Sequence, residues 1–212
     1  MNDTLKSSLQ SKRSGTTDKG YERAHEILVA ARRIFATQGY AGLSMRSVAS
    51  EVGVSLSNVQ HYYASKDMLV EAVLLYTMNL LQEKTDQITG AMAHASRAQQ
   101  FQSTIDMFFQ ELGDPITVAV FFESWALATR NAFASALMNT MLSRERKAIF
   151  KLIRGLSPNI SDEQYQIRAA LIVAQIHGLL LFRMTNTDKR SNLASFEKAA
   201  KDVVLRLSME PG

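Results

Sequence analysis

Apolar residues recur at steps of three and four along most of this 212-residue chain, which is the spacing of one face of an α-helix. The first such run begins at Tyr21 and is stopped by Gly39. No segment alternates between apolar and polar residues as a half-buried strand does. The pattern therefore predicts an all-α fold. The apolar positions of the first predicted helix are Ala24, Ile27, Leu28, Ala31, Ile34 and Phe35.

Capping residues place the later helices. Ser65 is expected to cap a long helix over about 66–89 that bridges two domains. In Gly113-Asp114-Pro115, glycine ends one helix, aspartate caps the next and proline takes its first position. Further helices are predicted over about 115–130, 131–154, 161–183 and 195–207, the third of them starting at a capping box of Ser161 and Gln164. The polar residues 1–19 predict a flexible tail.

Residues 44–66, SMRSVASEVGVSLSNVQHYYASK, contain two short predicted helices joined by a turn. Ala49 lets the first helix cross close to the second, and Gly53 supplies the left-handed backbone of the turn. Ser55 caps the second helix, on which Val59 and Tyr62 share an inward face. A helix-turn-helix of this kind places its second helix in the major groove of DNA. The remaining side chains of that helix point toward a partner.

The same stretch resembles the N-terminal domain of TetR-type transcriptional repressors, where a pattern close to T-x-R-x-I-A-x-x-A-G-V-S-x-x-x-x-Y-x-Y-F-x-x-K recurs. The resemblance extends from about Tyr21 to about Leu75, and its visible departures are Gln60 and Ala64. Positions in register, or closely replaced, are Ser44, Arg46, Val48, Ala49, Gly53, Val54, Ser55, His61, Tyr62, Tyr63, Ser65 and Lys66.

The resemblance implies which residues contact DNA. Arg46 and Lys66 are placed to flank the groove, where positive charge and helix N-termini attract phosphates. Asn and Gln side chains can pair with adenine, and Leu56 can meet a thymine methyl group. An alternative treats Tyr62 and Tyr63 as part of the core. The full candidate set comprises Ser44, Arg46, Ser55 and Lys66; Leu56, Ser57, Asn58 and Gln60 toward the bases; and His61, Tyr62 and Tyr63 near phosphates.

Charge and composition agree with a DNA-facing domain joined to a different one. Residues 1–70 hold nine Lys/Arg against six Asp/Glu, a net of +3, which leaves +1 of the total +4 for residues 71–212. The absence of cysteine excludes a disulfide framework and a thiolate metal site. No apolar run is long enough for a signal peptide or a membrane span, so we expect a cytoplasmic protein without a membrane partner.

Catalytic and metal-binding functions are disfavoured by the residue pattern. The four histidines are scattered, with no second ligand at helical spacing and no Ser-His pair. We therefore predict no catalytic residues, no metal and no cofactor. His177 lies on an apolar helix, so a hydrogen-bonded core histidine is favoured there over a ligand contact. The histidines are His25, His61, His94 and His177.

The part of the chain after residue 90 is rich in aromatic side chains. Most of these are expected in the core, but residues 121–125, FFESW, mix three aromatics with a carboxylate. Glu123 either pairs with Arg130 as a structural bridge or lies at the wall of an effector pocket. Through F-F-E-x-W-A and A-L-I-V-A-Q-I-H-G-L-L-L, this region also resembles the BetI-like group of TetR-type regulators. The candidate effector residues are Phe108, Phe121, Phe122, Glu123, Trp125, Arg130 and His177.

Small residues recur at four-residue steps on the penultimate predicted helix. Ala170, Ala174 and Gly178 form a stripe along which another helix can approach closely. In the TetR family the last two helices build a four-helix dimer interface, so the candidate homodimer contact is this stripe with Leu181 and the apolar side of residues 196–207. An intramolecular seam would have the same pattern. A dimer reads a palindrome whose half-sites lie roughly 34–36 Å apart.

These observations predict three segments: a tail over 1–19, a helix-turn-helix domain over 20–66, and a ligand-binding and dimerisation domain over 67–212. The predicted function is a repressor that binds an operator in double-stranded DNA and is released by a small-molecule effector. One alternative is a ligand-independent DNA-binding or interaction protein whose aromatic body is only core. Another is an all-α enzyme with a chance helix-turn-helix.

Overall fold

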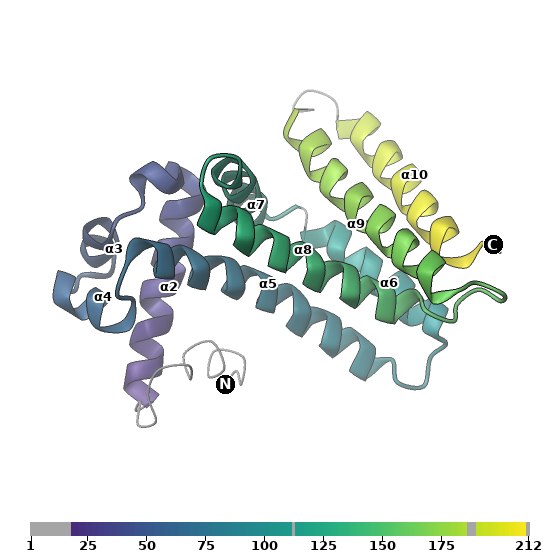
Figure 1. The fold of residues 1–212 in the computed structure, drawn as a ribbon, viewed down its shortest axis with the longest axis horizontal. Helices are drawn as coiled ribbons and strands as arrows, with labels where there is room; N and C mark the ends of the chain where they lie inside the picture. The colour runs from purple at the N-terminus through teal and green to yellow at the C-terminus, as the bar shows by residue number, and fades with distance from the viewer. Residues whose placement is uncertain (1–17, 112, 186–189, 211–212) are drawn as a thin grey trace. The chain divides into compact units, whose positions relative to one another are not determined.

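The all-α prediction is confirmed by the computed structural model, which describes residues 18–111, 113–185 and 190–210. The first 17 residues of the predicted tail lie outside the described part, whereas residues 18 and 19 are helical. The helices in the described residues are α2 (Asp18–Gly42), α3 (Met45–Val52), α4 (Leu56–Tyr62), α5 (Lys66–Ala91), α6 (Arg97–Glu111), α7 (Pro115–Ala128), α8 (Ala132–Ile153), α9 (Asp162–Thr185) and α10 (Arg190–Met209) (Figure 1).

The predicted caps are formed by local hydrogen bonds. The Oγ of Ser65 accepts from the backbone N–H of Met68 at 3.2 Å. Asp114 accepts from the N–H groups of Ile116 and Thr117, with Pro115 at the first helical position. The capping box of Ser161 and Gln164 is present in both directions, at 3.2 Å each. Local sequence signals therefore set where these helices begin.

Helix boundaries differ from the prediction at both ends of α2, which begins at Asp18 and not at Tyr21, and at the start of α10. Gly39 leaves the helical conformation with φ of 68° and ψ of −176°, and α2 then resumes to Gly42, so the predicted stop is a kink. A positive φ favours glycine because it has no Cβ. The last helix, α10, begins at Arg190 instead of near residue 195. Three of the five residues that it adds are polar, Arg190, Ser191 and Asn192, so apolar spacing gives little signal there.

The chain forms two compact units that do not follow the sequence order. The first unit comprises Met1–Gln82 and Asp114–Met138, and the second comprises Glu83–Gly113 and Asn139–Gly212. Helix α7 therefore belongs with the N-terminal helices, although the chain reaches it only after α6. The functional division at residues 66 and 67 stays a prediction, since compactness alone does not test it.

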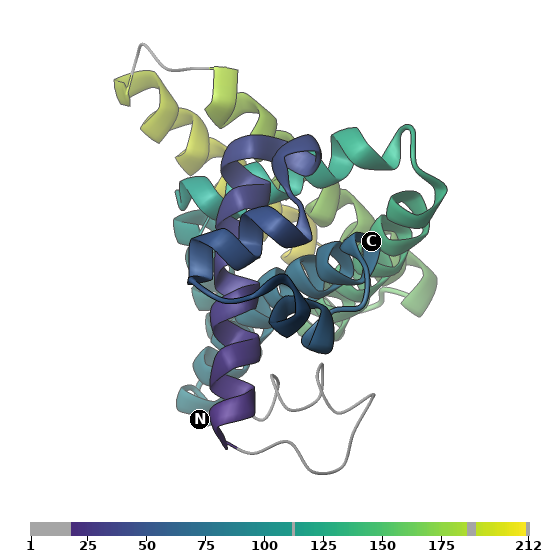
Figure 2. The same cartoon turned by 90° about the vertical axis from the view of Figure 1, so that its left-hand side faces the viewer.

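The first unit is built on α2. Figure 2 faces α2, α3 and α4, with the two short helices packed across the longer one. The side chains of Phe35, Leu43, Val48 and Val59 are fully buried here. Because burying such a side chain contributes roughly 1.5–3 kcal/mol, this small core is sufficient to fix the short helices on α2. They could not be stable alone at this length.

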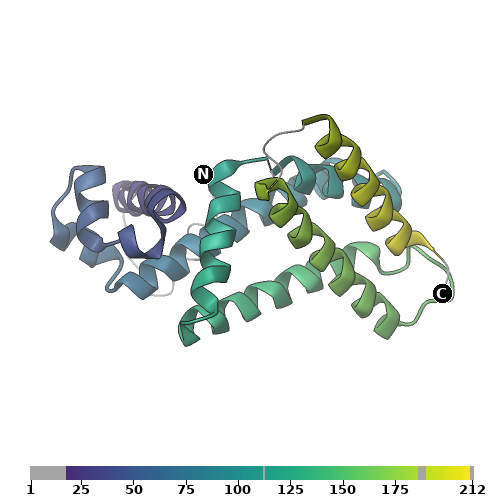
Figure 3. The ribbon, with the colours of Figure 1, turned by 90° about the horizontal axis from the view of Figure 1, so that it is seen from above.

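The second unit contains α6, α9 and α10 and the larger part of α8. Helices α9 and α10 lie side by side, as Figures 1 and 3 show. Phe101, Ile105, Ile153 and Ile172 are fully buried in this unit. The end of α10 is fixed by Ser157, whose Oγ donates toward the carbonyl oxygens at positions 209 and 210, at 2.8 Å each. These contacts satisfy carbonyl groups that a helix end leaves unpaired.

Candidate nucleic-acid interface

The turn between α3 and α4 has the predicted backbone. Gly53 is left-handed, with φ of 73° and ψ of 34°, and its N–H points back to the carbonyl oxygens of Ala49 and Ser50. The N–H of Val54 also donates to Ala49, at 2.9 Å. Because a glycine adopts this conformation without a Cβ clash, the chain reverses sharply and α4 starts at once.

Two serines in the candidate set cap helices. Ser44 accepts from the N–H of Ser47 at 3.0 Å, and Ser47 reciprocates in a capping box that starts α3. Ser55 accepts from the N–H of Asn58 at 3.2 Å and lies 3.0 Å from the Oγ of Ser57. Both caps are exposed, so their hydroxyl groups also remain accessible to a phosphate.

The outer face of α4 is polar and accessible. Ser57, Gln60 and His61 are exposed, and so is Arg46 on α3. Leu56, Asn58 and Tyr62 are half-buried at the edges of this face. The rings of His61 and Tyr62 meet edge to face, with centroids 5.0 Å apart. We call Leu56, Ser57, Asn58, Gln60 and His61 the outer face of α4.

The Asn58 side chain is turned partly inward. Its Oδ1 is buried and has no hydrogen-bond partner among the described residues. Bidentate pairing with adenine requires both the oxygen and the nitrogen of the carboxamide. The side chain therefore has to rotate outward to make that contact, whereas Gln60 already lies in solvent.

The structure corrects the assignment of Tyr63 to a phosphate contact. Its side chain is 3% exposed, and its hydroxyl donates to the carbonyl oxygen of Ala24 on α2 at 3.1 Å. Burial raises the pKa of this phenol. The backbone turns to an extended conformation at the end of α4, which directs the ring into the core. Tyr63 anchors α4 to α2, and its side chain cannot reach DNA.

Lys66 has a structural contact in addition to its predicted role. Its Nζ donates to the carbonyl oxygen of Tyr40 at 2.5 Å and lies 3.8 Å from the centroid of the Tyr40 ring. Burial lowers the pKa of the ammonium group, and the charge of Asp67 acts in the opposite direction. An ammonium carries three N–H groups, so a phosphate contact is compatible with this arrangement.

Most of the candidate effector residues lie in the first unit. Phe121 is buried, Phe122 is half-buried and Trp125 is exposed. A bridge from Glu123 to Arg130 is one of the two alternatives from the sequence, but the Oε1 of Glu123 instead accepts from the backbone N–H of Tyr40 at 2.7 Å. No ion pair joins Glu123 and Arg130 in the described structure, and Arg130 is exposed.

The other two candidates, Phe108 and His177, belong to the second unit. Phe108 is half-buried. The Nε2 of His177 lies 3.0 Å from the Oε2 of Glu145, and both side chains are mostly buried. This arrangement agrees with the interpretation of a core histidine beside a polar neighbour. Sequence reasoning missed Glu145, since the two residues are 32 positions apart and no local pattern links them. No group of three or more His, Asp or Glu residues in the described part of the chain could hold a metal ion.

The small-residue stripe on α9 faces outward. Ala174 and Gly178 are exposed, Ala170 is half-buried, and a Cβ at Gly178 would meet open space. Sequence reasoning missed two larger members of this face, Ile167 and Leu171. Together with Leu181 they are 49% to 58% exposed. From residue 167 to residue 181, the exposed apolar and small residues fall at steps of four, three, four and three, which is the spacing of a helix-packing seam. We call Ile167, Leu171, Ala174, Gly178 and Leu181 the α9 seam.

By length and composition alone, one helix in the described chain, over Asp162–Arg183, is apolar enough to cross a membrane, with a mean hydropathy of 1.4. This is weak evidence, because packed helices of soluble proteins pass the same test. Part of the apolar character of this helix comes from the α9 seam. An exposed apolar face of this kind is also what a contact with another helix would require.

Comparison with known proteins identifies the class. Residues 27–73 match the family of bacterial regulatory proteins of the tetR family, and residues 97–208 match the C-terminal region of BetI-type transcriptional repressors. The chain therefore belongs to the TetR family of transcriptional regulators, which are not enzymes. The predicted resemblance is confirmed in both regions.

Individual relatives and a solved structure are transcriptional regulators as well. BetI of Rhizobium meliloti is 26% identical over 75% of this chain and 76% of its own length. The nicotine-responsive repressor HdnoR of Paenarthrobacter nicotinovorans is 28% identical over 62% of this chain and 68% of its own. A transcriptional regulator of Saccharomonospora viridis, solved in complex with choline, has the same fold, with a TM-score of 0.69 and 21% identity over 86% of this chain and 95% of its own.

Proposed function

We propose that this protein is a repressor that binds a palindromic operator as a homodimer and leaves it when a small molecule binds the C-terminal part of the chain. The observation that carries the proposal is the outer face of α4, which is polar and held on α2 by the buried Val59 and Tyr63. A rigid helix with an outward polar face can present the same side chains to base edges each time it docks. A function on DNA supports a cytoplasmic location.

The α9 seam supports the homodimer. Its exposed apolar residues would be costly on a monomer and are suited to packing against the same face of a second copy. Burying one leucine contributes about 2 kcal/mol, and two-fold symmetry counts each residue twice. Leu171→Glu is therefore expected to weaken the dimer on the order of a thousand-fold. Val29→Glu is the matched control, since Val29 is an exposed apolar residue on α2.

Sedimentation velocity across a protein concentration series measures this effect. We expect the wild type and Val29→Glu to remain dimeric where Leu171→Glu is monomeric. If Leu171→Glu dimerises as tightly as the wild type, the α9 seam is not the interface.

Operator binding is tested by selection from genomic fragments at several salt concentrations. The wild type should enrich one palindrome, and Asn58→Ala/Gln60→Ala should lose that preference while it keeps salt-dependent binding to any DNA. The matched control is Gln102→Ala/Gln110→Ala, which removes two exposed carboxamides from α6. Binding without any preferred sequence would contradict the operator proposal.

Release by an effector is supported by two relatives, one described as nicotine-responsive and one solved with choline. Choline and nicotine are therefore the first probes to titrate against the protein bound to its operator. A coupling of 1–3 kcal/mol corresponds to an operator affinity lowered roughly 5- to 150-fold by a cognate effector. Operator affinity that no member of a broader small-molecule panel changes would favour the ligand-independent alternative.

A further inference from the structure

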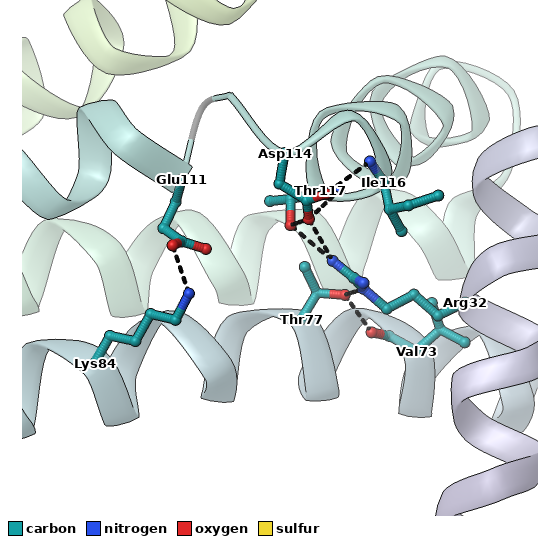
Figure 4. A network of polar contacts seen from close by, with 8 residues as sticks. All are labelled: Arg32, Val73, Thr77, Lys84, Glu111, Asp114, Ile116 and Thr117. Atoms are coloured by element: carbon teal, nitrogen blue, oxygen red, sulfur yellow. Dashed lines mark hydrogen bonds and ion pairs between the residues drawn. The ribbon is translucent and has the colours of Figure 1, made fainter.

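Arg32 on α2 binds two other helices of the first unit at once. Its Nε donates to the Oγ1 of Thr77 on α5 at 3.2 Å. Its Nη2 donates to the Oγ1 of Thr117 at 2.7 Å and to the Oδ2 of Asp114 at 3.3 Å, both at the start of α7. Figure 4 shows the guanidinium between α5 and this end of α7. We call Arg32, Thr77, Asp114 and Thr117 the Arg32 network.

The partners of Arg32 are themselves held in place. Thr77 donates to the carbonyl oxygen of Val73 at 2.9 Å, and Thr117 donates to Asp114 at 2.5 Å. Burial alone would raise the pKa of Asp114, but hydrogen bonds from Thr117, from the first turn of α7 and from Arg32 outweigh it and lower that pKa. The carboxylate therefore stays charged opposite the guanidinium. A planar guanidinium facing fixed acceptors defines an orientation, which a flexible ammonium does not.

A second contact joins the same pair of helices further along. The carboxylate of Glu123 on α7 accepts from the N–H of Tyr40 and packs directly on Gly39, where an added Cβ would lie 3.0 Å from it. Helix α2 is thus fixed to α7 both at Arg32 and at its kink. Because α3 and α4 pack on α2, these contacts determine how α4 is oriented relative to α5 and α7.

We propose that Arg32 is a positioning residue for operator recognition. It touches no DNA; it holds α2, and with it α4, in one orientation on α5 and α7. The inference rests on the proposed function, since two copies of α4 must meet two half-sites at a set spacing. If the two copies of α4 are held rigidly, operators with a different half-site spacing bind more weakly, whereas loosely held copies of α4 tolerate a change of spacing.

The test compares operators whose half-site spacing is the selected one with operators one base pair longer or shorter. We call the loss of operator affinity on such a change the spacing penalty. For the wild type we expect a spacing penalty of at least about ten-fold, since one base pair shifts a half-site by about 3.4 Å along the DNA helix and also rotates it. Arg32→Met keeps the aliphatic stem and removes the guanidinium. It should bind the selected operator more weakly and reduce the spacing penalty to about three-fold or less. Arg32→Lys keeps the charge and should recover part of the penalty.

The matched control is Arg33→Met, at the next position of the same helix. Arg33 is 60% exposed and pairs with Glu51, whereas Arg32 is 16% exposed. This variant loses the same charge and should keep the spacing penalty of the wild type. Thr77→Val/Thr117→Val removes two of the three acceptors of Arg32 and preserves side-chain shape, so it decides the question if Arg32→Met fails to fold.

The outcomes separate this inference from the proposed function. The positioning role is supported if the spacing penalty is reduced in Arg32→Met or in the double threonine variant but not in Arg33→Met. An equal loss of affinity at every spacing, or no change, overturns it and leaves Arg32 a stabilising residue. If the wild type selects no palindrome, the proposed function fails first, and the positioning role falls with it.

Discussion

Replacing Tyr63 by Phe separates a structural role from a DNA contact. The change removes one hydroxyl group and keeps the ring, so no cavity forms in the core of the first unit. The lost interaction is the neutral hydrogen bond of 3.1 Å from the hydroxyl to the carbonyl oxygen of Ala24. Ala24 lies inside α2, so that carbonyl keeps its helical partner and is not left unpaired.

The expected cost follows from these contacts. A buried neutral hydrogen bond contributes a net 0.5–1.5 kcal/mol, so the free energy of unfolding should fall by about 1 kcal/mol. In a chain of this size that corresponds to a Tm lowered by roughly 2–4 °C. Operator affinity at fixed salt should change less than about two-fold, because the hydroxyl is inside the protein.

Thermal unfolding by circular dichroism at one protein concentration measures the first quantity, and fluorescence anisotropy with labelled operator measures the second. Tyr62→Phe serves as the comparison, since Tyr62 is only half-buried on the same helix. That variant should leave Tm nearly unchanged and weaken operator binding if its hydroxyl meets a phosphate. A Tyr63→Phe protein with unchanged Tm and clearly weaker operator binding would refute the assignment of Tyr63 to the core.

Three further predictions concern the titration of Tyr63, the titration of Asp114 and the end of α10 that Ser157 holds. The pKa of Tyr63 is raised in the folded state, so the stability that its protonated hydroxyl contributes is complete below the unfolded pKa of about 10 and is lost as pH rises. The free energy of unfolding should therefore fall less steeply with alkaline pH in Tyr63→Phe than in the wild type. The folded pKa of Asp114 is lowered, so its contribution is present above the unfolded value of about 3.9 and is lost as pH falls; Asp114→Asn should flatten acid unfolding followed by circular dichroism. Ser157→Ala should lower the free energy of unfolding in urea by about 1 kcal/mol and speed amide exchange at the end of α10, because its hydroxyl satisfies carbonyl groups there; exchange unchanged at that end would contradict this role.

The sequence by itself determined what depends on neighbours within about four positions. Apolar spacing predicted the helices, and the caps at Ser55, Ser65 and Asp114 predicted their starts. Gly53 predicted the turn of the helix-turn-helix, because its left-handed backbone is a property of one residue. These signals suffice for the fold class and for the position of the outer face of α4.

The tertiary structure decided which side chains are partners, because those contacts join residues far apart in the chain. Tyr63 meets Ala24 over 39 positions, Glu123 meets Tyr40 over 83, and Arg32 meets Thr117 over 85. No local pattern distinguishes a tyrosine that turns into a core from one that faces a phosphate, or a glutamate that holds a backbone N–H from one that lines a pocket. Only the packing of α4 and α7 on α2 decides which contacts these two side chains make, since burial and hydrogen bonding are properties of the assembled unit.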